Sequence, residues 1–233
     1  MVDAITLRYN GGMGKRGPKI KIVEDFVWTP ELAYVVGLLT TDGCLINDGR
    51  HIDLTSKDIE QLENFNMCLG KNARISKKKS GFSKRIYYRV QISDAGLYRF
   101  LLSIGLSPAK TKIMKEIRVP DDYFFDFLRG HHDGDGSFYS YYDPRWKSSF
   151  MFYLSFISAS ADHIIWLQKH IKKLLQIEGS LSLPQSSSVW QLRYAKSDSL
   201  KILRKMYFSK NVVCLSRKRL KIEKALGIVD EVL

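Results

Sequence analysis

The chain has 233 residues, 45% of them hydrophobic, which is enough length and apolar surface for one or two packed cores and excludes a wholly disordered protein. Its 37 Lys and Arg residues against 24 Asp and Glu residues give a net charge of +13, so a polyanion is the leading partner. The three cysteines have neither zinc-ligand spacing nor a disulfide pattern, and no segment is typical of a signal peptide or a membrane span. We therefore expect a soluble intracellular protein, cytoplasmic or organellar, that is not secreted and has no membrane partner.

The first half of the chain predicts a helix, two strands, a helix, two strands and a helix. Residues 1–28 come before them, and their glycines, lysines and arginines favour a flexible basic arm. Thr29 is placed to cap the first helix, with Pro30 at its first position. The predicted elements are, in chain order, a helix at 30–41, strands at 44–47 and 51–56, a helix at 58–69, strands at 73–79 and 84–92, and a helix at 95–103.

The second half repeats this order, which indicates a duplicated unit. Asp122 is placed to cap its first helix and Asp162 its second. The predicted elements are a helix at 123–133, strands at 137–142 and 150–157, a helix that follows Asp162, strands at 179–183 and 189–194, and a helix at 199–208. Residues 196–224 contain ten Lys or Arg and two acidic residues, so we expect this region to add phosphate contacts.

Alternating residues predict sheets with one packed face and one basic, hydrogen-bonding face. Residues 71–89 contain eight Lys or Arg and no acidic residue, which is compatible with a solvated sheet edge guarded by lysines. The mixture of Arg, Gln, Ser and Tyr favours nucleic acid instead, because these side chains contact phosphates and base edges. The predicted DNA contacts are Arg74, Lys78, Arg85, Tyr87, Arg89, Gln91, Gln191 and Arg193.

A nine-residue pattern occurs twice, as VVGLLTTDG at residues 35–43 and as LRGHHDGDG at residues 128–136. Gly37 and Gly130 lie within the two predicted helices, where glycine costs about 1 kcal/mol relative to alanine. Close packing of the two helices through these glycines would offset that cost. It would also bring the helix ends, and with them Asp42 and Asp135, together.

Two neighbouring carboxylates at helix C-termini repel each other and oppose the helix dipoles, and divalent cations would relieve both effects. Oxygen ligands favour Mg²⁺, which can polarise a phosphate, activate water and stabilise a leaving oxygen in phosphodiester hydrolysis. The alternative is that Asp42 and Asp135 only end their helices at glycine turns.

The chain resembles the LAGLIDADG homing endonucleases in their single-chain form with two motifs, over roughly residues 29–226. The resemblance rests on the two motifs, the repeated element order, and the segments LSPAKTK at 106–112 and LSRKR at 215–219. It implies an α+β fold of two pseudo-twofold related αββαββα repeats, at 29–120 and 121–233, with antiparallel DNA-binding sheets. The implied function is intron homing by a monomer that makes a Mg²⁺-dependent double-strand break in a long target site. Asp42 and Asp135 would be the metal ligands, sharing two or three divalent ions between the motif helices.

The resemblance assigns further roles and also shows departures. Lys110 and Lys218 match the basic residues that organise water and transition-state charge, with Lys112 as a nearby competitor of Lys110. The strand ends that commonly supply a glutamine in this family carry Ser56, Lys57 and Ser158, and Thr40 replaces an acidic residue that the second motif keeps as Asp133.

A histidine pair, His131 and His132, replaces apolar residues of the second motif and favours packing over metal ligation. Two alternative functions remain open. One is an RNA-binding intron splicing cofactor, or maturase, with structured intron RNA as its partner. The other is a catalytically inactive DNA-binding regulator.

Overall fold

The first half of the chain folds as the alternating pattern predicts, as helices on one face of a four-stranded antiparallel sheet. The computed structural model describes residues 26–79, 86–146, 148–184 and 188–233, so most of the expected basic arm and the predicted DNA contact Arg85 lie outside the described residues. The elements are α1 (Pro30–Thr41), β1 (Gly43–Leu45), β2 (His51–Ser56), α2 (Ile59–Cys68), β3 (Ser76–Lys79), β4 (Ile86–Ser93) and α3 (Ala95–Ser103). The strand order is β1-β2-β4-β3.

The second half repeats this arrangement. After the short 3-10 helices η1 (Lys110–Lys112) and η2 (Asp121–Tyr123) come α4 (Phe124–Asp135), β5 (Ser137–Tyr142), β6 (Phe150–Ser158), α5 (Ala161–Leu175), β7 (Ser180–Ser182), β8 (Trp190–Tyr194), α6 (Lys196–Met206) and α7 (Ser216–Gly227). The strand order β5-β6-β8-β7 matches that of the first sheet. The predicted pair of antiparallel sheets is therefore present in the described residues.

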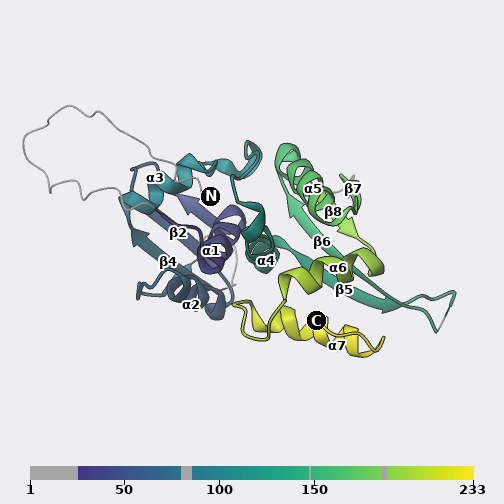
Figure 1. Ribbon diagram of the computed structural model, residues 1–233. Helices are drawn as coiled ribbons and strands as arrows, with labels where there is room; N and C mark the ends of the chain where they lie inside the picture. The colour runs from purple at the N-terminus through teal and green to yellow at the C-terminus, as the bar shows by residue number, and fades with distance from the viewer. Residues whose placement is uncertain (1–25, 80–85, 147, 185–187) are drawn as a thin grey trace, which may run out of the picture.

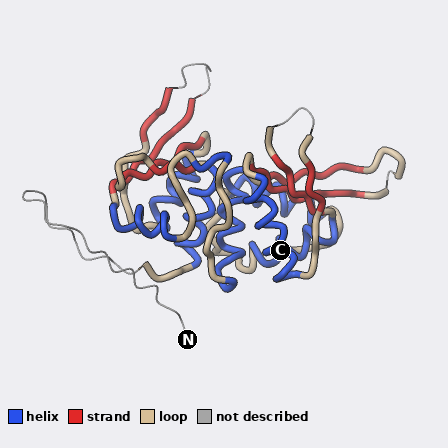
Figure 2. Tube along the Cα trace, turned by 90° about the horizontal axis from the view of Figure 1, so that it is seen from above, coloured by secondary structure: helices blue, strands red, loops and turns tan. Residues whose placement is uncertain are grey.

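The core lies between the helices and the inward faces of the two sheets, and the outward faces form a common strand surface. Figure 2 shows the strands of both sheets gathered on one side of the molecule and the helices on the other. α1 and α4 lie between the two sheets (Figure 1). The inward strand faces are fully buried at Ile52, Leu54 and Val90 in the first sheet and at Phe152, Leu154 and Leu192 in the second. The outward faces of both sheets are thus free to contact a partner on the same side.

Several local predictions were wrong. Asp122 does not cap α4, because a 3-10 turn beginning after Pro120 leads directly into that helix. Ser160 caps α5 in place of Asp162, since its side chain accepts the hydrogen bond of the His163 amide. The sequence also missed α7, whose first residue lacks a side-chain cap. No helix in the described ranges is long and apolar enough to cross a membrane.

Candidate functional site

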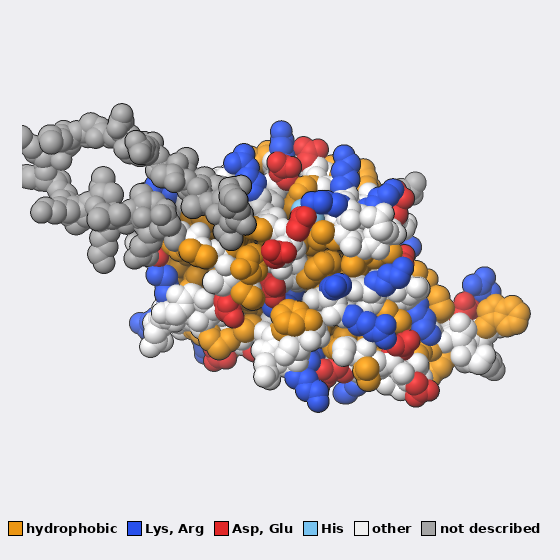
Figure 3. All heavy atoms as spheres, viewed as in Figure 1, with side chains coloured by type: hydrophobic (Ala, Val, Ile, Leu, Met, Phe, Trp, Pro, Cys, Tyr) orange, Lys and Arg blue, Asp and Glu red, His pale blue; other side chains and the backbone are white. Residues whose placement is uncertain are grey.

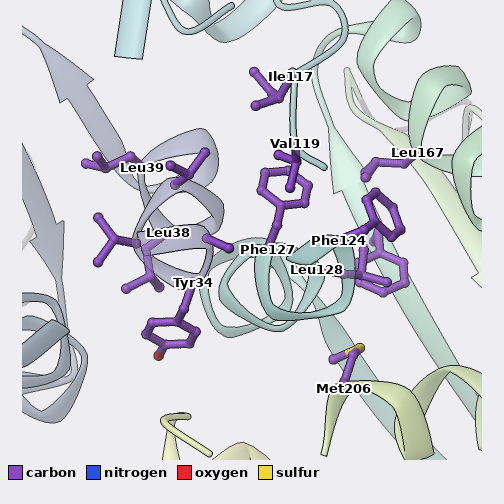
Figure 4. Close-up of a cluster of buried hydrophobic side chains, with 14 of the residues drawn as sticks. Tyr34, Leu38, Leu39, Ile117, Val119, Phe124, Phe127, Leu128, Leu167 and Met206 are labelled. Atoms are coloured by element: carbon purple, nitrogen blue, oxygen red, sulfur yellow. The ribbon is translucent and has the colours of Figure 1, made fainter. Parts of the chain in front are cut away.

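Two glycines allow α1 and α4 to approach at backbone distance. A Cβ added to Gly37 would lie 2.1 Å from the carbonyl oxygen of Phe127, and one added to Gly130 would lie 2.0 Å from that of Tyr34. Only a residue without a Cβ permits this approach. Figure 4 shows the two helices side by side, with hydrophobic side chains such as Leu38 and Phe127 around the contact. The contact places the C-terminal ends of the two helices next to each other.

Those helix ends carry Asp42, the C-cap of α1, and Asp135, the last residue of α4. The Asp42 carboxylate lies against the end of α4, because a Cβ on Gly134 would be 3.3 Å from Asp42 Oδ2. Burial, followed by the charge of Asp135, raises the pKa of Asp42 to about 6. Burial also raises the pKa of Asp135. The structure therefore brings the two predicted carboxylates into one electrostatically coupled site.

A glutamine that the sequence did not single out holds one of these carboxylates. Gln61 of α2 donates from Nε2 to Asp42 Oδ2 at 2.9 Å, and Ser56 Oγ donates to Gln61 Oε1 at 2.8 Å. The hydroxyl of Ser56 thus orients the amide of Gln61. Gln61 comes from the helix that follows the second strand, and Ser56 at the end of that strand contacts it. Gln61 is buried beside the apolar stripe of α2. Hydrophobic periodicity does not distinguish such a buried polar residue from an exposed one, so the sequence gives no signal for it.

The two lysines reach the site from different elements. Lys110 of η1 is buried, and its Nζ donates to the carbonyl oxygen of Gly43, directly after Asp42. Lys112, the competitor, is exposed. Lys218 of α7 donates to the carbonyl oxygens of His132, Gly134 and Gly136, the last two at 3.1 and 2.8 Å. Both lysines therefore bind the glycine carbonyl that follows a motif aspartate.

The hydrogen bonds of the two ammonium groups differ in number. An ammonium has three donors, and Lys218 uses all three on main-chain carbonyls at the end of α4. Lys110 uses one donor within the described residues and keeps two for a ligand. Burial lowers the pKa of Lys110 and lowers that of Lys218 to about 8. Lys218 thus caps the C-terminus of α4, whereas two donors of Lys110 have no partner among the described residues.

The first motif has Thr40 where the second motif has the acidic residue Asp133, and the two side chains make different contacts. Thr40 Oγ1 donates to the carbonyl oxygen of Val36 at 2.7 Å within its own helix. Asp133 Oδ2 accepts from the Tyr34 hydroxyl at 2.8 Å and from the Leu215 amide at 2.7 Å. Burial raises the pKa of Asp133 to about 6. Asp133 therefore ties α4 to α1 and to the segment that leads into Lys218.

Histidines occupy the core of the second half. His163 follows its helix cap at the same distance as Gln61 in the first half, but its Nε2 faces His131 Nε2 at 3.3 Å and its Nδ1 lies 2.8 Å from the carbonyl oxygen of Lys115. Because a carbonyl only accepts, His163 carries its proton on Nδ1 and accepts the Nε2 proton of His131. Burial lowers the pKa of His131, His132 and His163. Among the described residues, no group of three or more His, Cys, Asp or Glu is arranged to hold a metal ion.

The predicted DNA contacts that the structure describes lie on the outward faces of the two sheets, except Arg74. Lys78, Tyr87, Arg89 and Gln91 share the outward face of the first sheet, and Gln191 and Arg193 share that of the second. Arg74 is exposed but comes before β3.

A cross-strand carboxylate changes the charge of the first face. Arg89 forms an ion pair with Asp53 at 2.7 Å, so part of its charge is neutralised. Lys57 lies over the ring of Tyr87, with its Nζ 5.8 Å from the ring centroid. The sequence could not identify Asp53 as the partner of Arg89, since the register between β2 and β4 sets that pair.

Comparison with known proteins confirms the resemblance and the fold. The family model of the LAGLIDADG-like domain matches residues 29–105. No curated protein sequence matches the chain. The homing endonuclease I-WcaI bound to its DNA recognition sequence is similar, with 13% identity, a TM-score of 0.57 and coverage of 89% of this chain and 95% of that one. I-SmaMI bound to an uncleaved DNA target with calcium ions gives 15% identity, a TM-score of 0.55 and coverage of 87% and 91%.

Full-length DUF199/WhiA from Thermatoga maritima has the same fold. Its identity is 17%, its TM-score is 0.57, and the match covers 91% of this chain. The present chain spans only 64% of that protein. At these identities the solved structures establish the fold, and the two four-stranded antiparallel sheets are those of the LAGLIDADG arrangement.

Proposed function

Because residues 29–105 form a LAGLIDADG-like domain and the chain has the LAGLIDADG homing endonuclease fold, we propose that this protein is a site-specific endodeoxyribonuclease that works as a monomer in intron homing. The observation that carries the proposal is the pair of carboxylates, Asp42 and Asp135, coupled at the ends of two interlocked helices. In this proposal the repeats are residues 29–120 and 121–233, and the outward sheet faces bind double-stranded DNA on either side of the carboxylates.

The donor set fits Mg²⁺. Within the described residues, neither oxygen of Asp135 accepts a hydrogen bond, and Asp42 accepts only the one from Gln61. Asp42 is half-buried and Asp135 is exposed, desolvation raises the pKa of both, and the charge of Asp135 raises that of Asp42 further, so this pair of open carboxylates favours a hard divalent cation. Two carboxylates do not complete a coordination shell, so DNA phosphate oxygens and water would supply the other ligands. When bound, the metal would polarise the scissile phosphate and activate water.

The remaining residues have distinct tasks in this mechanism. Asp42 and Asp135 would hold the two or three divalent ions. Gln61 fixes the orientation of the Asp42 carboxylate, because its amide is itself held by Ser56. Lys110, which uses one donor on the carbonyl oxygen of Gly43, would offer its other two donors to the phosphate or the attacking water. Lys218 contributes positive charge near the site while it holds the end of α4.

Cleavage of a randomised duplex library in the presence of Mg²⁺ tests the proposal. Sequencing of the cut ends should yield one long preferred site. Asp42→Asn and Asp135→Asn should each abolish cleavage and preserve DNA affinity, since amides bind divalent ions weakly. Asp122→Asn, which changes an exposed carboxylate away from the site, should cut normally.

Continued cleavage by the variant that carries both asparagines would refute the assignment. Specific duplex binding without cleavage by the wild type would instead support a DNA-binding regulator. Tight binding of structured intron RNA without DNA cleavage would support a splicing cofactor.

A further inference from the structure

The outward face of the second sheet carries a stack of tyrosines. Tyr139 of β5 lies opposite Tyr153 of β6, and Tyr141 follows on the same face. The rings of Tyr139 and Tyr153 are 5.2 Å apart with an interplanar angle of 18°, and Tyr141 lies 6.1 and 6.3 Å from them at 9°. We call Tyr139, Tyr141 and Tyr153 the tyrosine stack. Their hairpin projects from the body and carries hydrophobic side chains at its end (Figures 1 and 3).

The tyrosine stack is extended by one arginine. The guanidinium of Arg193 lies 5.1 Å from the ring centroid of Tyr153, and its Nη1 donates to the Tyr139 hydroxyl at 3.4 Å. Arg193 is the only charged side chain among the described strand residues of this face. The rest of the face consists of serines, Gln191, and two partly buried apolar side chains, Met151 and Ile157.

The two outward faces therefore differ in chemistry. The first sheet presents Lys78 and the ion pair of Arg89 and Asp53, so it can neutralise phosphates and bind polar base edges. The second sheet presents ring edges, hydroxyl groups and apolar side chains that are already ordered by stacking. Ordered side chains lose little conformational entropy on binding.

The stacking also determines which nucleic acid the second face fits. Single-stranded nucleic acid binds through bases that stack on open ring faces. In the tyrosine stack the rings lie nearly parallel beside one another and the guanidinium of Arg193 lies over the Tyr153 ring, so neighbours on the sheet compete with a base for these faces and leave ring edges for a partner. An edge of this kind fits the major groove of a duplex, where the one apolar group is the C5-methyl of thymine. A tyrosine hydroxyl both donates and accepts, so it can form a hydrogen bond with a donor or with an acceptor of an adjacent base pair.

We infer that the second sheet recognises a thymine-rich half of the DNA target through the methyl groups that line its major groove, an inference that rests on the proposed DNA-binding function. Tyr139, Tyr141 and Tyr153 supply the contacting edges, and Arg193 supplies the single cationic contact. The first sheet contacts its half through Lys78 and polar side chains. The methyl dependence of binding accordingly arises in the second half, whereas both halves contribute to the salt dependence.

The test begins with selection of bound duplexes from a randomised library without divalent metal, so that it does not depend on cleavage. An iron chelate attached to Cys44, which is exposed on the outward face of the first sheet, marks the half bound by that sheet. Deoxyuridine is then substituted for thymidine in each half in turn. Each lost methyl in the second half should weaken binding about fourfold, as expected for one buried methyl-sized group, and substitutions in the first half should have little effect.

Matched variants assign the effect to the tyrosine stack. Tyr141→Ser should weaken binding, remove the discrimination between thymidine and deoxyuridine, and leave the salt slope unchanged. Tyr142→Ser changes the next tyrosine of the same strand, which lies on the other face, and should retain the discrimination. Lys78→Gln should lower the salt slope by about one and retain the discrimination. Thermal unfolding of each variant verifies that it is folded.

The outcomes separate the two proposals. Three results would overturn the inference and leave the DNA-binding function standing. These are specific duplex binding without methyl dependence, equal methyl dependence in both halves, and equal behaviour of Tyr141→Ser and Tyr142→Ser. Failure of the selection to enrich any duplex overturns both.

Discussion

The glycine contact between α1 and α4 predicts that a side chain added at Gly130 lowers the stability of the fold. In Gly130→Ala, the new Cβ would lie 2.0 Å from the carbonyl oxygen of Tyr34 and 3.1 Å from the amide nitrogen of Leu38. Both atoms belong to the backbone, so no rotamer change can relieve the overlap, and the helices must move apart. Overpacking of this kind costs about 1 to 3 kcal/mol or more. Alanine recovers about 1 kcal/mol of helix propensity. Because both contacts are with backbone atoms, the cost lies at the upper end of that range, about 3 kcal/mol, and we expect a net loss of about 2 kcal/mol.

The matched control is Gly227→Ala, at the end of α7, where no atom lies within 4 Å of the added Cβ. This variant should be as stable as the wild type or more stable by up to about 1 kcal/mol. For a chain of this length, 2 kcal/mol lowers the Tm by about 4 to 8 °C. Circular dichroism melts of the wild type and both variants at neutral pH measure the difference. A Gly130→Ala protein that unfolds at or above the wild-type temperature would refute the reasoning.

Three further perturbations follow from the site and its surroundings. Asp42→Asn should stabilise the metal-free protein by up to about 2 kcal/mol above pH 6 and have no effect below pH 4. The pKa of Asp42 is about 6 in the folded state and lower in the unfolded state, so ionisation of this carboxyl lowers the stability of the wild type as the pH rises from 4 to 6. Urea unfolding at pH 4 and pH 7.5 measures this, and equal gains at both pH values would contradict it. Gln61→Ala should slow cleavage of one strand at least about tenfold, with DNA affinity unchanged, so that nicked plasmid accumulates; equal slowing of both strands would argue against a local role. Arg129→Leu should cost about 3 to 5 kcal/mol, because the buried Asp126 loses a partner at 2.7 Å, and adding Asp126→Leu should recover part of the loss in urea unfolding. No recovery in that second variant would mean that the hydrogen bonds from Arg129 to the carbonyl oxygens of Met206 and Val213, at 2.7 and 2.8 Å, dominate.

Local patterns predicted most of the elements because their signals are short-range. Thr29 caps α1 as expected, and alternation located β5 with the correct ends. The predicted N-cap was wrong where a second polar residue lay nearby, as with Ser160 two residues before Asp162. α7 was missed because its few buried apolar residues are outnumbered by lysines and arginines, and packing against the rest of the chain stabilises it.

The site was predictable only as far as the motifs reach. The spacing of glycine and aspartate in each motif was enough to expect a pair of carboxylates. The approach of Gln61 to Asp42, and the use of every Lys218 donor on carbonyls, depend on tertiary contacts that no local pattern encodes. Asp53 is a similar case, since it meets Arg89 only through the pairing of β2 with β4.

The backbone contact between α1 and α4 also bears on how the molecule unfolds and how its specificity can change. One continuous hydrophobic cluster extends through both helices and both sheets, so neither repeat has a separate core. The two repeats should therefore unfold in a single cooperative transition. The separation of the two sheets is fixed by glycine backbones and does not depend on the side chains of the outward faces. Under the proposed function, substitutions on those faces would alter which bases are bound, while the distance between the two halves of a target would stay constant.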